Sequence, residues 1–74
     1  MTPEELQKLA DATTGLRYEN FWDSYYIVRD IAWDNFLYRN LKKDFTRARY
    51  AVVEQHNIEA ACFMLQDIVR KMVQ

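Results

Sequence analysis

Glycine, proline, cysteine, histidine and serine occur only once each in this chain of 74 residues. Because glycine-rich phosphate and dinucleotide loops need several residues without a Cβ atom, the single Gly15 excludes them. Cys62 has no second cysteine for an intrachain disulfide, and Cys62 and His56 together cannot fill a four-ligand zinc site. Ser24 has no neighbouring base or oxyanion pocket in the sequence. We therefore expect no metal, no cofactor and no catalytic activity.

Long apolar runs are also missing. The longest, residues 60–65, is far too short to cross a bilayer. Residues 2–5 lack the basic and apolar character of an export signal, and an unpaired cysteine without such a signal favours a reducing compartment. With 11 acidic residues against 10 Lys and Arg, the chain has no overall charge that attracts nucleic acid or anionic lipid. We therefore expect a cytoplasmic protein that does not bind membranes.

The chain does contain a large amount of apolar and aromatic surface. Half of the residues are hydrophobic and 15% are aromatic. The length predicts one helical domain over residues 1–74, and a domain this small buries only about 60% of the surface of its unfolded chain. Without a disulfide or a metal its core is marginal, so self-association is the remaining source of stability. The sequence therefore predicts a homo-oligomer.

Local signals predict one helix near each end of the chain. Thr2 can cap a helix that starts at Pro3, and Gly15 suits the left-handed position that follows its end, which predicts a helix over residues 3–13. Asn57 can cap a helix over residues 58–73. The apolar stripe of that helix is formed by Ile58, Ala61, Cys62, Leu65, Ile68, Val69, Met72 and Val73.

The middle of the chain is harder to divide. Apolar positions in residues 18–39 fall on one broad helical face. Beyond that segment the apolar direction turns by roughly 150° on the helical wheel, which predicts a bend or break within 40–44 and places Asp44 as the cap of a helix over 44–55. One long unbroken helix is the alternative. No segment has a strand pattern, so the predicted fold is an all-α bundle of three to four helices, assembled as a homo-oligomer.

Arg29 has the most unusual position of any polar residue, near the centre of the aromatic face of the helix predicted over 18–39. Its guanidinium can stack on a ring or pair with an acid from another helix, which would be a structural role. The alternative is a site for an anion, because a guanidinium binds phosphate through two parallel hydrogen bonds. The candidate ligand-binding residues are Arg29, Trp22, Tyr26 and Trp33.

A second candidate surface is apolar. Ile27, Ile31 and Tyr38 follow one another at spacings of four and seven on the otherwise polar side of the same helix. Phe63 points away from the apolar stripe of the last helix. We interpret these four residues as an interface with another copy or with a partner. The isoleucines can equally face the first helix.

A third candidate surface is basic. Residues 39–49 hold five basic side chains against Asp44, with Phe45 among them and Tyr38 and Tyr50 on either side. Such a segment can bind phosphates while an aromatic ring stacks on a base. On the helical wheel, however, the charges spread around the helix instead of forming one stripe, and the rest of the chain is net acidic. This pattern favours a solvated face that balances the acids of the second helix. The candidate nucleic-acid-binding residues are Arg39, Lys42, Lys43, Arg47 and Arg49.

These observations favour a cytoplasmic, self-associating helical protein that acts as an adaptor or inhibitor through contacts with itself and with another protein. Such a protein needs no catalytic groups, and buried Tyr, Trp and Arg anchors would supply the binding energy. The alternative is a module that binds a nucleotide or nucleic acid through Arg29 or through the basic segment 39–49.

Overall fold

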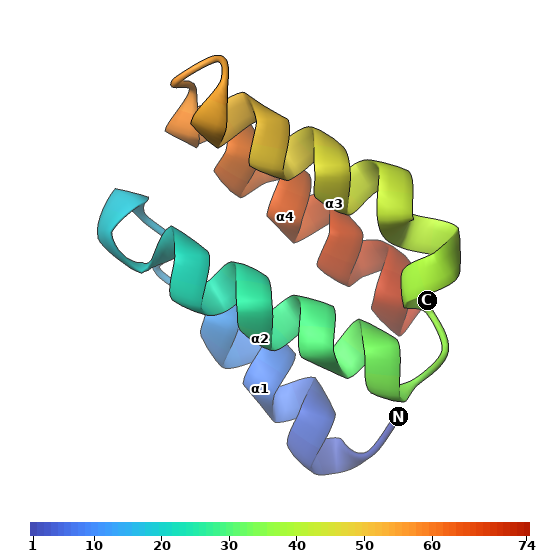
Figure 1. Ribbon diagram of the computed structural model, residues 1–74. Helices are drawn as coiled ribbons and strands as arrows, with labels where there is room; N and C mark the ends of the chain where they lie inside the picture. The colour runs from blue at the N-terminus through green and yellow to red at the C-terminus, as the bar shows by residue number, and fades with distance from the viewer.

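The computed structural model describes all 74 residues as four α-helices joined by short turns, without any β-strand (Figure 1). The all-α prediction is confirmed. The helices are α1 (Pro3–Thr13), α2 (Phe21–Asp34), α3 (Tyr38–Val53) and α4 (Ile58–Val73), and one 3-10 turn, η1 (Tyr18–Asn20), leads into α2.

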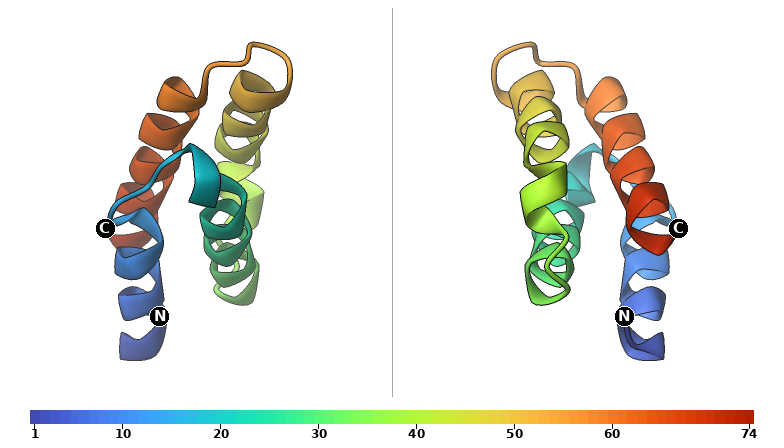
Figure 2. Two further views of the ribbon diagram at one scale, coloured as in Figure 1. Left: turned by 90° about the vertical axis from the view of Figure 1, so that its left-hand side faces the viewer. Right: turned by 90° about the vertical axis from the view of Figure 1, so that its right-hand side faces the viewer.

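The helices form two antiparallel hairpins, α1 with α2 and α3 with α4, packed one on the other (Figure 1). Seen from the side, α1 and α4 lie in one layer and α2 and α3 in the other (Figure 2). Both chain ends and the turn between α2 and α3 lie at the same end of the bundle (Figure 1). No helix is both long and apolar enough to cross a membrane.

The first and last helices begin where their caps predicted. The Thr2 hydroxyl accepts a hydrogen bond from the Glu5 backbone N–H at 3.1 Å, and the Thr2 N–H donates to the Glu5 carboxylate at 3.0 Å, which together form a capping box. At the start of α4, the Asn57 side chain accepts from the Ala60 N–H at 3.2 Å. These bonds satisfy backbone donors that have no partner within the helix.

The core lies between the two layers and combines large and small side chains. Tyr25 packs edge-on against Phe45, with ring centroids 5.7 Å apart, and joins α2 to α3. Alanines at fully buried positions let the helices approach closely. The fully buried large residues are Phe21, Phe45, Leu9, Leu65, Ile68 and Val28, and the fully buried alanines are Ala32, Ala48, Ala51 and Ala61.

The predicted boundary between the second and third helices is wrong, and so is the alternative of one unbroken helix. The break lies at residues 35–37, so α2 ends five residues before the predicted position and α3 begins six residues early. Asp44 lies inside α3 and pairs with Lys71 at 3.1 Å, so it caps nothing.

The break is a Schellman motif with a phenylalanine at its left-handed position. Phe36 has φ of 59°, its N–H donates to the Trp33 carbonyl at 3.2 Å, and the Leu37 N–H donates to the Ala32 carbonyl at 2.8 Å. Glycine normally occupies this position because it has no Cβ atom to clash. With phenylalanine there, the sequence carries no local signal for the turn.

Candidate binding surface

The exposed half of α3 carries five cationic side chains without an ionic partner. Leu41, Phe45 and Ala48 face the core, and the cationic positions fall within an arc of about 160° on the other side of the helix. The charges that were expected to be scattered therefore share the solvent face. The five residues, all exposed and in none of the ion pairs of the structure, are Arg39, Lys42, Lys43, Arg47 and Arg49.

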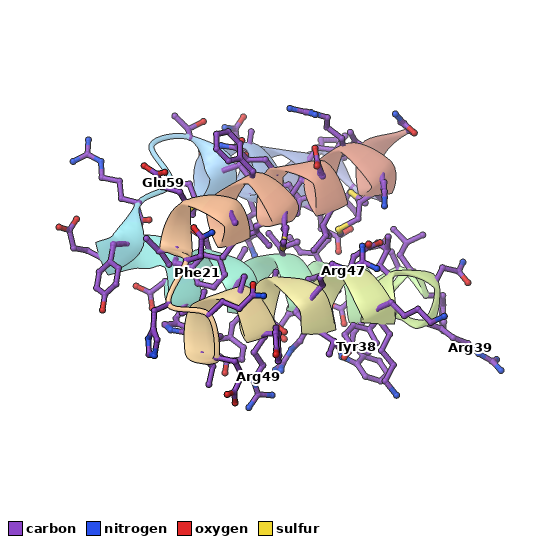
Figure 3. The ribbon with its side chains drawn as sticks, turned by 90° about the horizontal axis from the view of Figure 1, so that it is seen from above. Phe21, Tyr38, Arg39, Arg47, Arg49 and Glu59 are labelled. Carbon is purple, nitrogen blue, oxygen red and sulfur yellow. The ribbon has the colours of Figure 1, made fainter.

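The only acid of α3 is already neutralised. Asp44 pairs with Lys71 of α4 at 3.1 Å. Figure 3 shows Tyr38, Arg39 and Arg49 on the side of α3 that points away from α4, and Arg47 at the edge nearer α4. Helix α3 has a formal charge of +4, so the rest of the chain, whose total is −1, carries −5. The protein is therefore charge-segregated although its net charge is small.

Exposed rings gather where α2 meets α3. Trp33 stacks on Tyr38 with ring centroids 4.6 Å apart and an angle of 10° between the planes, and Tyr38 in turn stacks on Phe45 at 5.5 Å. Trp33 remains 59% exposed and Phe36 is 91% exposed. One shallow hollow is lined by Trp33, Phe36, Tyr38, Arg39 and Lys42.

A second hollow adjoins the first along α3. Its lining residues are Lys42, Lys43, Thr46, Arg47 and Tyr50, so Lys42 belongs to both. No carboxylate lines either hollow. We call the residues of the two hollows together the α3 surface. Arg49 is exposed on the same helix but lines neither hollow.

The structure divides the cluster that was predicted around Arg29. The Arg29 guanidinium carbon lies 4.6 Å from the centroid of the Tyr26 ring, and Trp22 stacks on Tyr26 at 6.0 Å. The contact between Arg29 and Asp30 is long, at 4.0 Å, and the Arg29 Nε atom is buried without a partner. Trp33 instead stacks on Tyr38 and belongs to the α3 surface. Stacking on a ring was the structural role considered for Arg29.

The four residues expected to form an interface do not lie together. Ile31 is only 5% exposed and belongs to the core, so its expected place on the surface is wrong. Helix α1 packs beside α2, and Ile27 and Ile31 line the groove between these helices. Tyr38 is half-buried under Trp33, and Phe63 is 67% exposed on α4.

The groove between α1 and α2 is mainly acidic. Glu5, Asp11, Asp30 and Asp34 line it, with Lys8 as its single cation. The hydrogen bond from the Thr2 N–H, and a second bond from the Asn35 side-chain amide at 3.0 Å, lower the pKa of Glu5 from its usual value. The groove thus has an excess of negative charge, with four acids and one cation, whereas α3 has five cations and one acid.

The remaining reactive groups are dispersed. Burial, and to a smaller degree the nearby Glu59 carboxylate, raises the pKa of the Cys62 thiol. Ser24 is buried. No three His, Cys, Asp or Glu side chains are placed to hold a metal ion. His56 has φ of 52° in the turn between α3 and α4, so it contributes to that turn.

Comparison with protein families, with curated proteins and with solved structures finds no match for this chain. Its function is therefore inferred from the chemistry of the α3 surface and the acidic groove.

Proposed function

We propose that this chain is a small helical interaction protein that binds an anionic macromolecule through the α3 surface and, as an adaptor or inhibitor does, acts by contact and not by catalysis. The observation that carries the proposal is the set of unpaired cations on α3 beside the exposed rings of Trp33 and Phe36. Neither feature is neutralised or covered by the rest of the molecule.

The rings supply binding energy only when a partner covers them. Aromatic side chains dominate the energetics of many interfaces because each buries a large area with little loss of conformational freedom. Trp33 is already ordered by Tyr38, so a partner that covers it loses little extra entropy. Covering Trp33 and Phe36 would remove apolar surface from water without rearranging the core.

The cations determine the sign of the partner. An unpaired cluster of one charge attracts an oppositely charged molecule over a distance and repels a molecule of the same charge. Arg and Lys side chains on one helical face can each approach a carboxylate or a phosphate. The partner is therefore anionic where it contacts α3.

Self-association is part of the proposal, with a restricted geometry. Two copies joined symmetrically through α3 would place cation against cation, which is repulsive. The α3 surface of one copy can instead meet the acidic groove between α1 and α2 of the next copy. This contact is head-to-tail and extends into a ring or a filament.

The proposal is tested by retention on an immobilised polyanion. The wild type should bind polyglutamate beads at low salt and elute as salt is added, because screening weakens charge pairing. A triple variant with Lys42→Gln, Lys43→Gln and Arg47→Gln should elute at clearly lower salt. Arg17→Gln removes an exposed cation that lines neither hollow nor the acidic groove, and should elute like the wild type. Equal elution of the triple variant and the wild type would exclude the α3 surface as the contact.

A further inference from the structure

Along the axis of α3, the α3 surface carries rings at its two ends and cations between them. Trp33 and Phe36 lie at the end of α3 where it meets α2, and Tyr50 lies three helical turns further along the helix. A rise of 1.5 Å per residue places Tyr38 and Tyr50 about 18 Å apart along the axis. Lys42, Lys43 and Arg47 occupy the interval between these rings.

The exposed rings are suited to stacking. Trp33 is held nearly parallel to Tyr38, at 10°, so one face of its indole is already packed and its orientation is set before any ligand arrives. Phe36 is almost fully exposed in a turn that three backbone hydrogen bonds fix. A flat unsaturated ring laid on such a platform gains stacking energy whatever its identity.

A bilayer fits this arrangement poorly. If Phe36 entered a membrane end-on, Arg47 would lie about 16 Å up the helix. That distance exceeds the screening length of about 8 Å at physiological salt, so the cations beyond the first turn would contribute little in that orientation. Lying flat, α3 would present polar side chains between its terminal rings, without the apolar face by which interfacial helices bind.

An acidic polypeptide or a duplex also fits less well. A polypeptide supplies carboxylates for the cations but need not supply a flat ring beside each charge. A duplex supplies phosphates, but its bases are stacked inside and cannot reach Trp33 or Phe36. An unpaired strand carries a phosphate and an accessible base on every unit, so it can supply bases to the rings at the two ends of the surface and phosphates to the cations between them.

We infer that the anionic ligand of the α3 surface is a single-stranded stretch of nucleic acid, with bases stacked on Trp33 and Phe36 and phosphates paired with Lys42, Lys43 and Arg47. This inference rests on the proposed function and specifies its partner. The acidic groove on the other side of α2 repels the strand and leaves α3 as the surface on which it binds.

The test measures fluorescence anisotropy of labelled probes against the purified full chain. The probes are oligothymidylate, oligouridylate, a duplex of the same length, polyglutamate, and vesicles rich in phosphatidylserine. Both single strands should bind more tightly than the duplex, and the first two probes distinguish DNA from RNA as the natural source. With the three phosphate contacts of Lys42, Lys43 and Arg47, the logarithm of the binding constant should fall against the logarithm of salt concentration with a slope of about −2.

Two variants separate the roles of charge and ring. Lys43→Gln should reduce the salt slope by about 0.7. The control Arg17→Gln removes an exposed cation outside both hollows and the acidic groove, and should leave the slope unchanged. Phe36→Asn suits the left-handed turn and should preserve the fold, which circular dichroism verifies. It should weaken single-strand binding by on the order of tenfold without changing the salt slope.

Each contrary result has a distinct meaning. Equal affinity for duplex and single strands, with no effect of Phe36→Asn, would overturn the single-strand inference. Binding of polyglutamate or vesicles without binding of single strands would also overturn the single-strand inference. In that case, weaker retention of the triple variant on polyglutamate beads would still support the proposed function. No binding of any anionic probe at low salt would overturn both.

Discussion

Phe36 combines two properties that folding alone does not explain. It holds a left-handed backbone conformation, which costs a residue with a Cβ atom about 1–2 kcal/mol. Its side chain is 91% exposed, so packing within the chain does not offset this cost. Strained residues cluster at binding sites and active sites, and Phe36 is one of the residues of the α3 surface.

The first prediction concerns Phe36→Gly. Glycine relieves the strain in the folded state, but it also raises the conformational entropy of the unfolded chain, which costs about 0.4–1 kcal/mol of stability. We therefore expect a net gain in unfolding free energy of about 1 kcal/mol. A gain of this size raises the melting temperature by about 4–8 °C in a domain of this length. Urea and thermal denaturation measure both quantities. A loss of stability would show that the ring supports the fold.

The second prediction concerns the Cys62 thiol, whose pKa is raised mainly by burial against the core. A raised pKa lowers the fraction of reactive thiolate near neutral pH. We expect iodoacetamide to alkylate Cys62 in the folded protein more slowly than in the urea-unfolded chain at the same pH. Mass spectrometry follows the reaction. Equal rates in both states would mean that the thiol is not protected.

Among the helices, α1 depends most on hydrogen bonds at its start. Glu5 completes the capping box with Thr2 and also accepts a bond from Asn35, the residue that follows the last turn of α2. One carboxylate therefore joins the beginning of α1 to the end of α2. Its charged form is favoured in the folded state, which lowers its pKa from 4.5.

The third prediction follows from the sign of this shift. Because the folded pKa of Glu5 lies below the unfolded one, its contribution is complete above the unfolded pKa and is lost as pH falls through the folded pKa. When pH falls from neutral to below the ordinary carboxyl range, we expect the unfolding free energy of Glu5→Gln to decrease by less than that of the wild type. Urea titrations at a series of acidic pH values test this. Identical pH profiles would contradict it.

The helices at the two ends of the chain could be predicted to the residue, and those in the middle could not. The start of α1 and the start of α4 are encoded by side chains that cap their own helix, as Thr2 and Asn57 do. The turn after α2 has a phenylalanine where glycine is usual, and Leu37, the N-cap residue of α3, makes no side-chain capping bond. In the absence of local signals, only the shift in apolar direction indicated a break.

For the molecule as a whole, the unequal distribution of charge is the feature with the clearest consequence. The α3 surface contains no carboxylate, and the groove between α1 and α2 contains four. A small net charge therefore conceals two surfaces of opposite charge, and the proposed head-to-tail contact would join them.

The fourth prediction is concentration-dependent self-association at low salt, measured by static light scattering. We expect the mean mass to rise with concentration and to fall when salt is added. Lys43→Gln should weaken the association, because it removes charge from the basic side. Lys8→Gln should strengthen it, because it makes the groove more acidic. A monomer at every concentration and salt, or the same effect from both variants, would exclude the head-to-tail contact.

The amino-acid sequence by itself determined the helical class, the first and last helices, and the exclusion of glycine-rich phosphate loops, since helical periodicity and caps depend on residues a few positions apart. It also identified the basic residues of α3. Only the tertiary structure decided that Ile31 is covered by α1, that Trp33 stacks on Tyr38 and not near Arg29, and that all five cations of α3 share the exposed side. Those outcomes depend on which helix packs against which face. That packing is determined by the apolar area that residues far apart in the chain bury against each other.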